Sequence, residues 1–238
     1  YGKAESFNMF IPDLMGGGFA TKFSDDGAVA NSLTKYGARG LSRQLPTYWG
    51  DQPGTGGPTY LGASVIFLFV LGLFLLRGRN KWWVAIVTAL AVMLAWGNNF
   101  MWLTELFFNY FPGYNKFRVV AMILVIAQWS VPFLAALVLC KVWTQKTTRQ
   151  ELIKGIKYSL YVTGGVALMF ILLGGFFFDF VSPSDAIVQQ QGIPQDVINA
   201  MRAERASIMR ADAFRSLIFV LLAAGVMFVF ALGRMKRG

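Results

Sequence analysis

A carboxylate, an amide and two cations follow one another closely within residues 98–118 and could take part in phosphate chemistry. Glu105 and Asn109 stand four residues apart, so they would share one face of a helix. Lys116 and Arg118 follow shortly afterwards, where two cations could neutralise a phosphate or a pyrophosphate. A carboxylate beside such a pair could orient an acceptor hydroxyl or a divalent ion.

A second candidate carboxylate, Asp51, stands in the Gly- and Pro-rich loop 45–58. We expect this loop to bring Asp51 and backbone N–H groups to a substrate at the membrane surface. The predicted catalytic candidates are thus Glu105 and Asp51, and the predicted substrate or phosphate contacts are Tyr114, Asn115, Lys116 and Arg118.

Both patterns have a purely structural alternative. Residues 100–111 could form an amphipathic helix in the membrane interface, with Lys116 and Arg118 reaching to lipid head groups. Tyr48 and Trp49 could be anchors in the aromatic belt at the same interface.

The residue types exclude several other chemistries. The chain has no His and one Cys, so it can form neither a zinc site of the usual nitrogen and sulfur type nor a Ser-His-Asp triad. A single Cys also excludes an intramolecular disulfide. We therefore predict no metal site and no cofactor, with a divalent ion at the candidate carboxylates left open.

The composition indicates that lipid is the solvent. Of 238 residues, 55% are hydrophobic and 14% are charged, whereas soluble domains carry about 25% charged residues. The mean hydropathy is +0.51. A span needs about 20 apolar residues, and we predict an all-α polytopic membrane protein with five transmembrane helices, over residues 60–76, 82–97, 119–140, 158–178 and 216–233. The predicted domains are an extracytoplasmic segment, 1–59, and a transmembrane domain, 60–238, with external segments 98–118 and 179–215.

The charge distribution predicts which side faces the cytoplasm. The loops after the first and third predicted spans, together with the C-terminal tail, carry 11 of the 22 Lys and Arg residues but only one acid, Glu151. The excess of cations in short loops predicts that this side faces the cytoplasm. The basic clusters flank spans rather than a soluble face, so we expect no nucleic-acid partner.

Local signals add detail to the external segments. Residues 25–36 predict a short helix that Asp25 or Asp26 would cap. Pro194 predicts the start of a helix that continues into the last span. Arg202, Glu204, Arg205 and Asp212 alternate in sign, which predicts a solvated or internally paired face. Since the chain starts at Tyr1 without an initiator Met, we expect it to be an interior part of a longer polytopic protein.

Four segments resemble the YfhO family of bacterial membrane proteins, especially its long forms from Bacteroidetes-type bacteria. They are Gly2-Lys3-Ala4-Glu5-Ser6-Phe7-Asn8, Ile11-Pro12-Asp13-Leu14-Met15-Gly16-Gly17, Tyr48-Trp49-Gly50-Asp51-Gln52-Pro53 and Pro112-Gly113-Tyr114-Asn115-Lys116-Phe117-Arg118. The resemblance implies a fragment of a GT-C-like helical bundle. It also implies a glycosyltransferase that moves a sugar from a polyprenyl-phosphate donor to a cell-envelope glycan acceptor. The catalytic carboxylate of such enzymes usually lies in the first external loop, which would stand upstream of Tyr1.

Two alternatives to a transferase stay open. A transporter or flippase for a lipid-linked substrate would need polar residues in the middle of several spans, and the predicted spans offer Gln128 and little else. A non-catalytic scaffold or subunit of a membrane assembly is compatible with all of these residues.

Overall fold

The structure is a computed structural model, and it describes every residue except 19, 53–58, 117–118 and 234–238. The described part is helical, apart from one isolated antiparallel bridge between Lys22 and Pro46. The α-helices are α1 (Ala28–Thr34), α2 (Ala63–Leu75), α3 (Asn80–Ala95), α4 (Met101–Tyr110), α5 (Val125–Trp143), α6 (Arg149–Phe177), α7 (Pro183–Gln190) and α8 (Gln195–Ala231). Short 3₁₀ helices are η1 (Ala4–Met9), η2 (Arg39–Gln44), η3 (Gly97–Phe100), η4 (Tyr114–Lys116) and η5 (Val120–Leu124).

Three helical segments are long and apolar enough to cross a membrane: Val120–Trp143, Arg149–Phe177 and Gln195–Ala231. A fourth arises if Lys81–Ala95 and Gly97–Tyr110, between which the helix direction bends by 116°, count as one broken span. Helix α2 is apolar but has 13 residues, about 20 Å, which is less than the hydrocarbon thickness of about 30 Å. Among the described residues, three to four helices could therefore span a membrane, which is consistent with a helical membrane protein, and the count of five stays a prediction.

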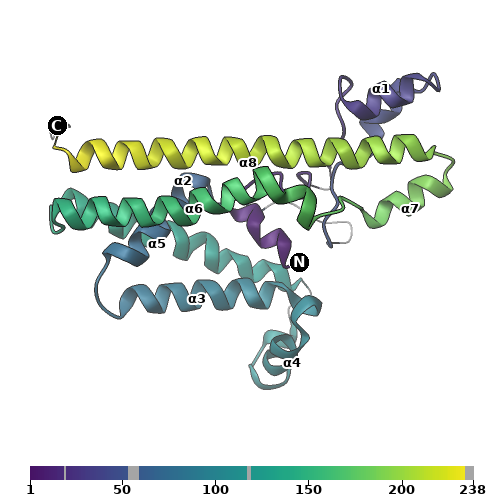
Figure 1. The fold of residues 1–238 in the computed structure, drawn as a ribbon. Coiled ribbons are helices and arrows are strands. Elements are labelled where there is room, and N and C mark those ends of the chain that lie inside the picture. Colours follow the sequence, from purple (N-terminus) through teal and green to yellow (C-terminus); the bar gives the residue numbers. More distant parts are fainter. Residues whose placement is uncertain (19, 53–58, 117–118, 234–238) are drawn as a thin grey trace. The chain divides into compact units, whose positions relative to one another are not determined.

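The chain forms two compact units. Unit 1 contains residues 1–6, 61–166 and 216–238, and unit 2 contains residues 7–60 and 167–215. Helices α6 and α8 run through both units (Figure 1). Helix α8 has 37 residues and is about 55 Å long, so it must extend well beyond the hydrocarbon core. Its apolar half, from Ser216, belongs to unit 1, and its charged half belongs to unit 2.

Close packing of α2 on α5 builds the core of unit 1. Phe67 and Leu71 on α2 are fully buried, as are Leu134 and Val138 on α5. Gly72 brings the helices together, since a Cβ there would lie 3.1 Å from Leu134 Cγ. Such a small residue lets the two helices pack closely enough for van der Waals contact to hold them together, because lipid offers no hydrophobic force between helices.

The cationic connectors of unit 1 meet at one end of its helices. Arg77, after α2, pairs with Glu151 near the start of α6. Lys141, at the end of α5, donates to the carbonyl of Leu75 at 2.6 Å. Trp143 stacks on Phe230 near the end of α8, with ring centroids 6.2 Å apart. These contacts bring the connectors after α2 and α5 and the end of α8 together, while the tail cations at 234–237 lie outside the described residues, and the side of the membrane stays a prediction.

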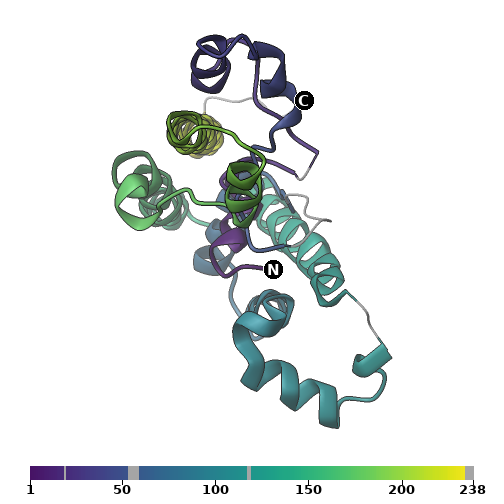
Figure 2. The ribbon, with the colours of Figure 1, turned by 90° about the vertical axis from the view of Figure 1, so that its right-hand side faces the viewer.

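At the other end of α3, the chain bends sharply and meets the N-terminal residues. Trp96 donates from Nε1 to Ser6 Oγ at 2.7 Å, and Asn99 donates to the carbonyl of Tyr1 at 3.0 Å. Helix α4 then turns aside from α3 (Figure 2). The predicted external residues 1–6 and 98–116 thus share one end of unit 1.

Unit 2 is built around a buried ion pair and a small apolar core. Arg205 on α8 has no exposed surface, and it donates to both carboxylate oxygens of Asp185 at 2.8 Å. Three further bonds reach the carbonyls of Thr47, Phe180 and Pro46. The adjoining apolar core consists of Phe23, Val29, Leu33, Leu45, Val188, Val197 and Met201. The prediction of a paired face on this helix is confirmed for Arg205, and the helix starts directly after Pro194, as predicted.

The predicted capping of the first helix by Asp25 or Asp26 is wrong. Helix α1 has no side-chain cap of its own, and Glu204 on α8 instead accepts a hydrogen bond from the Val29 N–H at 2.8 Å. Asp25 pairs with Arg43, which lowers the pKa of the Asp25 carboxyl. The N-terminus of α1 is therefore capped by Glu204, which is distant in sequence, and not by the neighbouring Asp25 or Asp26 that the local pattern predicted.

Asp13 makes unit 2 sensitive to pH. Burial and the adjacent Asp212 carboxylate raise the pKa of Asp13 to about 6, against the opposing charge of Arg215. Because the folded pKa is raised, this contribution to stability is complete below about pH 4 and is lost as the pH rises through 6. We expect a loss of about 1 kcal/mol, reduced by solvent screening.

The measurement is the thermal unfolding midpoint of the full-length protein between pH 4 and 7.5. The variant Asp13→Asn should flatten this profile, whereas Asp26→Asn, at an exposed surface pair, should leave it unchanged. Identical profiles for wild type and Asp13→Asn would contradict the assignment.

Candidate functional site

The predicted site residues fall in different units. Glu105, Tyr114, Asn115 and Lys116 belong to unit 1, and Asp51 belongs to unit 2. Arg118 lies outside the described residues. Each unit is therefore described with its own cavity.

Helix α4 carries the predicted carboxylate and amide on its solvent- or lipid-accessible surface. Glu105 and Asn109 are both exposed, and neither lines the cavity of unit 1. Trp102, Phe108 and Tyr110 are exposed on the same helix. A short helix with large exposed aromatic side chains agrees with the interfacial interpretation of residues 100–111.

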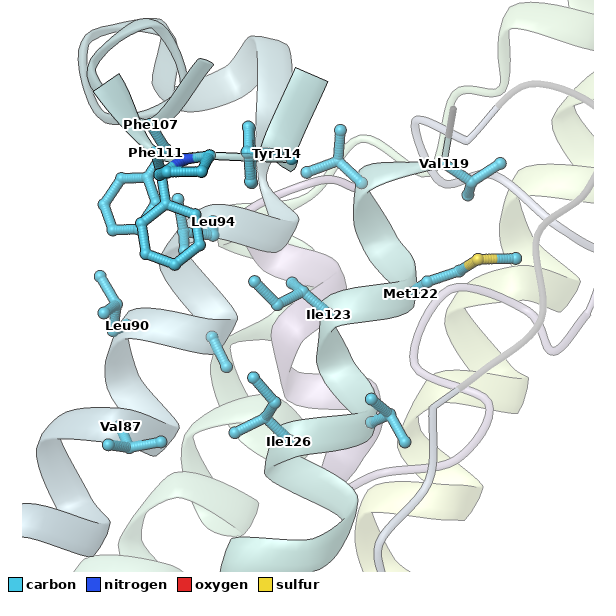
Figure 3. A pocket seen from close by; sticks show the side chains of 15 residues that line it. Val87, Leu90, Leu94, Phe107, Phe111, Tyr114, Val119, Met122, Ile123 and Ile126 are labelled. Carbon is cyan, nitrogen blue, oxygen red and sulfur yellow. The ribbon is translucent and has the colours of Figure 1, made fainter. Parts of the chain in front are cut away.

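An apolar cavity of about 570 Å³ lies beneath this helix in unit 1 (Figure 3). Leu90 and Leu94 line it from α3, and Ile123 and Ile126 line it from η5 and α5. Phe107 of α4, together with the following Phe111, closes one end (Figure 3). Nearly all of the lining is hydrocarbon, which suits an aliphatic chain.

The turn after α4 connects this cavity with the predicted phosphate contacts. Gly113 has a φ of +82°, which allows the chain to reverse after Pro112. Tyr114 is buried, lines the cavity and packs edge-on against Phe107, with ring centroids 5.8 Å apart. Asn115 and Lys116 follow on η4 with exposed side chains. A polar and cationic edge thus adjoins the rim of an apolar cavity.

Unit 2 holds a different cavity, of about 530 Å³, whose lining combines charged and polar side chains with apolar ones. Its walls are one face of α7, one face of α8 and the loops around residues 49–51 and 179–182. Asp51, the candidate from the sequence, lines this cavity together with Asp179 and Arg202. The two carboxylates are exposed, and Arg202 is half-buried.

Two donors at this cavity have no partner. Within the part of the chain that the structure describes, nothing accepts a hydrogen bond from Trp49 Nε1 or from Arg202 Nε, although both atoms are buried. An unpaired buried donor costs roughly 1–3 kcal/mol, so such groups are rare and usually meet water or a ligand.

Sequence reasoning missed Trp49, Asp179 and Arg202. Trp49 is not an interface anchor, because it is 8% exposed and packs edge-on against Phe178 and Phe180. Arg202 belongs to the alternating charges that predicted a structural face. Arg202 lines the cavity and Arg205 is buried in an ion pair because of which distant segments pack against each one. The local sequence around the two arginines does not show this difference.

Metal binding has no geometric support in the described ranges. No three Cys, Asp or Glu side chains there lie close enough together to hold an ion. In comparisons with protein-family models, with curated proteins and with solved structures, none matches this chain.

Proposed function

We propose that this chain is the membrane-embedded part of a GT-C-like glycosyltransferase. It would move a sugar from a polyprenyl-phosphate donor to a cell-envelope glycan on the outer face of the bacterial inner membrane. The observation that carries the proposal is the apolar cavity of unit 1, whose rim continues into the Tyr114–Lys116 turn. A lipid-linked sugar phosphate has the same order of chemical parts: a hydrocarbon tail, then an anionic head.

The tail would occupy the space between α3 and α5. An isoprenoid chain has no hydrogen-bonding groups, so a cavity lined by Leu, Ile, Val and Phe side chains meets its needs. The cavity lies between α3, η5 and α5, which belong to candidate spans, so in a membrane the isoprenoid chain could enter from the lipid without crossing water.

The phosphate would lie at the turn. Lys116 is an exposed cation directly after Tyr114 and Asn115, and Arg118 follows two residues later in the sequence. In the transfer, an acceptor hydroxyl attacks the anomeric carbon, the bond from that carbon to the phosphate oxygen breaks, and a base takes the hydroxyl proton. Polyprenyl phosphate leaves with an additional negative charge, which cations stabilise.

The carboxylates keep their candidate roles in this scheme. Asp51 would orient the acceptor, since it lines the cavity of unit 2. Glu105 would act from the membrane interface, where its exposed carboxylate can meet a substrate head group. The base itself is expected upstream of Tyr1, as the family resemblance implies.

Replacing Lys116 tests the proposal. We expect Lys116→Ala to lower sugar transfer about tenfold in the full-length protein, because one screened cation contact to the leaving phosphate is lost. The measurement follows radiolabelled sugar from a polyprenyl-phosphate donor into membrane glycan.

Lys116→Arg should keep most of the transfer, and Lys35→Ala serves as the matched control at an exposed lysine of unit 2. If Lys116→Ala and Arg118→Ala each keep full sugar transfer, the result would favour a non-catalytic scaffold instead.

A further inference from the structure

The cavity of unit 2 is lined by Trp49 and Arg202, each of which has a buried N–H without an acceptor among the described residues, and by the exposed carboxylates of Asp51 and Asp179. We infer that it binds a neutral saccharide through the sugar hydroxyls. The inference rests on the proposed function only for the role of that sugar, which would be the glycan acceptor.

The donor side consists of Trp49 and Arg202. Trp49 is 8% exposed, it lines the cavity, and its Nε1–H lacks an acceptor among the described residues. Arg202 also lines the cavity and takes part in no ion pair in the described structure, whereas Arg205, one turn further on the same helix, is fully paired. Two donors left open at one cavity point to a ligand with acceptor oxygens.

The acceptor side consists of Asp51 and Asp179, which line the same cavity with exposed carboxylates. The third acid there, Asp185, already pairs with Arg205 and accepts from the Ser182 N–H, so it is not available to a ligand. A ligand must therefore accept from one side of the cavity and donate to the other. A sugar hydroxyl does both at once.

Charge distinguishes a saccharide from an anion. A phosphate would gain Arg202 but would face Asp51 and Asp179, whose combined charge exceeds that of the single cation. A neutral sugar meets no such repulsion. Val181, Pro183 and Ile198 add apolar surface, on which the C–H face of a pyranose ring can rest. The volume of about 530 Å³ lies within the usual range of small-molecule sites, about 300–1,000 Å³.

The test is saturation-transfer NMR on the purified full-length protein in nanodiscs. The probes are the methyl glycosides of glucose, galactose, mannose and N-acetylglucosamine, with inorganic phosphate as a separate probe. We expect at least one glycoside to bind, and Arg202→Gln and Trp49→Phe each to weaken that binding about tenfold. Trp49→Phe keeps an aromatic ring against Phe178 and Phe180 but removes the N–H donor together with part of the indole, so the thermal unfolding midpoint is measured alongside binding to separate lost folding from a lost hydrogen bond.

Arg210→Gln is the matched control, since Arg210 is exposed on the same helix and does not line the cavity. The inference is overturned if no glycoside binds, if phosphate alone binds in an Arg202-dependent manner, or if Arg202→Gln and Trp49→Phe bind as tightly as wild type. If the protein binds a glycoside but has no transfer activity, the saccharide site is supported and the proposed function is contradicted. If Arg202→Gln and Trp49→Phe both transfer sugar as fast as wild type, the acceptor role of this site is contradicted and the proposed function is not.

Discussion

The variant Arg205→Ala is expected to lose the native fold of unit 2, at a cost of about 3–5 kcal/mol. Removing this side chain leaves the Asp185 carboxylate, which is 3% exposed, as an uncompensated buried charge. It also removes the donors for the carbonyls of Thr47, Phe180 and Pro46. These carbonyls come from two separate stretches of chain, so Arg205 ties both to α8.

The measurement is resistance of residues 7–60 and 167–215 to limited proteolysis, together with the thermal unfolding midpoint. Arg205→Lys should also be severely destabilised, because an ammonium group cannot make the two parallel bonds to Asp185. Arg43→Ala is the control, since its pair with Asp25 lies at the surface, where water and salt screen the attraction and the contribution to stability is small. Wild-type proteolysis of Arg205→Ala would show that the pair does not organise unit 2.

This ion pair illustrates what the sequence can and cannot predict. Alternating charges predicted a solvated or internally paired face on α8, because charges of opposite sign on one helix need partners or water, and the pairing is confirmed for Arg205. They could not show that Arg205 is buried while Arg202 lines a cavity. The partners of Arg205 stand 20 and 158 residues away in the chain, and no local pattern encodes such distances.

Helices were predicted better than their ends. The apolar run at 158–178 marks only part of α6, which starts at Arg149, because hydropathy detects the apolar part while Lys and Glu continue the helix without cost. Conversely, the run at 60–76 contains Gly62 with a φ of +101°, and the helix begins after it. Composition thus predicted apolar helices, whereas the residues at which each helix begins and ends depend on single positions such as Gly62.

In the candidate site, features that depend on neighbouring residues were predicted, and features that depend on the fold were not. The Pro112-Gly113 signal correctly ended a helix after residue 110, because turn chemistry is local. Trp49 was misinterpreted, since an aromatic residue near a span has the same signal whether it meets lipid or packs against Phe178 and Phe180. Only the fold distinguishes the two.

Filling the apolar cavity is expected to stop sugar transfer without unfolding the protein. Ala91 lies on α3, is 2% exposed and lines this cavity, so the ring of Ala91→Phe would occupy space that the polyprenyl chain needs. The cavity of about 570 Å³ can accept a phenyl ring at an overpacking cost of about 1–3 kcal/mol. We expect transfer, and photo-crosslinking of a polyprenyl phosphate with a diazirine in its tail, to fall to background.

Ala89→Phe provides the matched control, because Ala89 is exposed on the same helix and does not line the cavity. Leu90 lines the cavity next to Ala91, so adding Leu90→Ala to Ala91→Phe should restore part of the volume and part of the crosslinking. Such recovery separates a blocked cavity from a misfolded helix, since a second core truncation would only worsen misfolding. If folded Ala91→Phe is crosslinked as strongly as wild type, the lipid tail does not enter between α3 and α5, and the proposed role of this cavity fails.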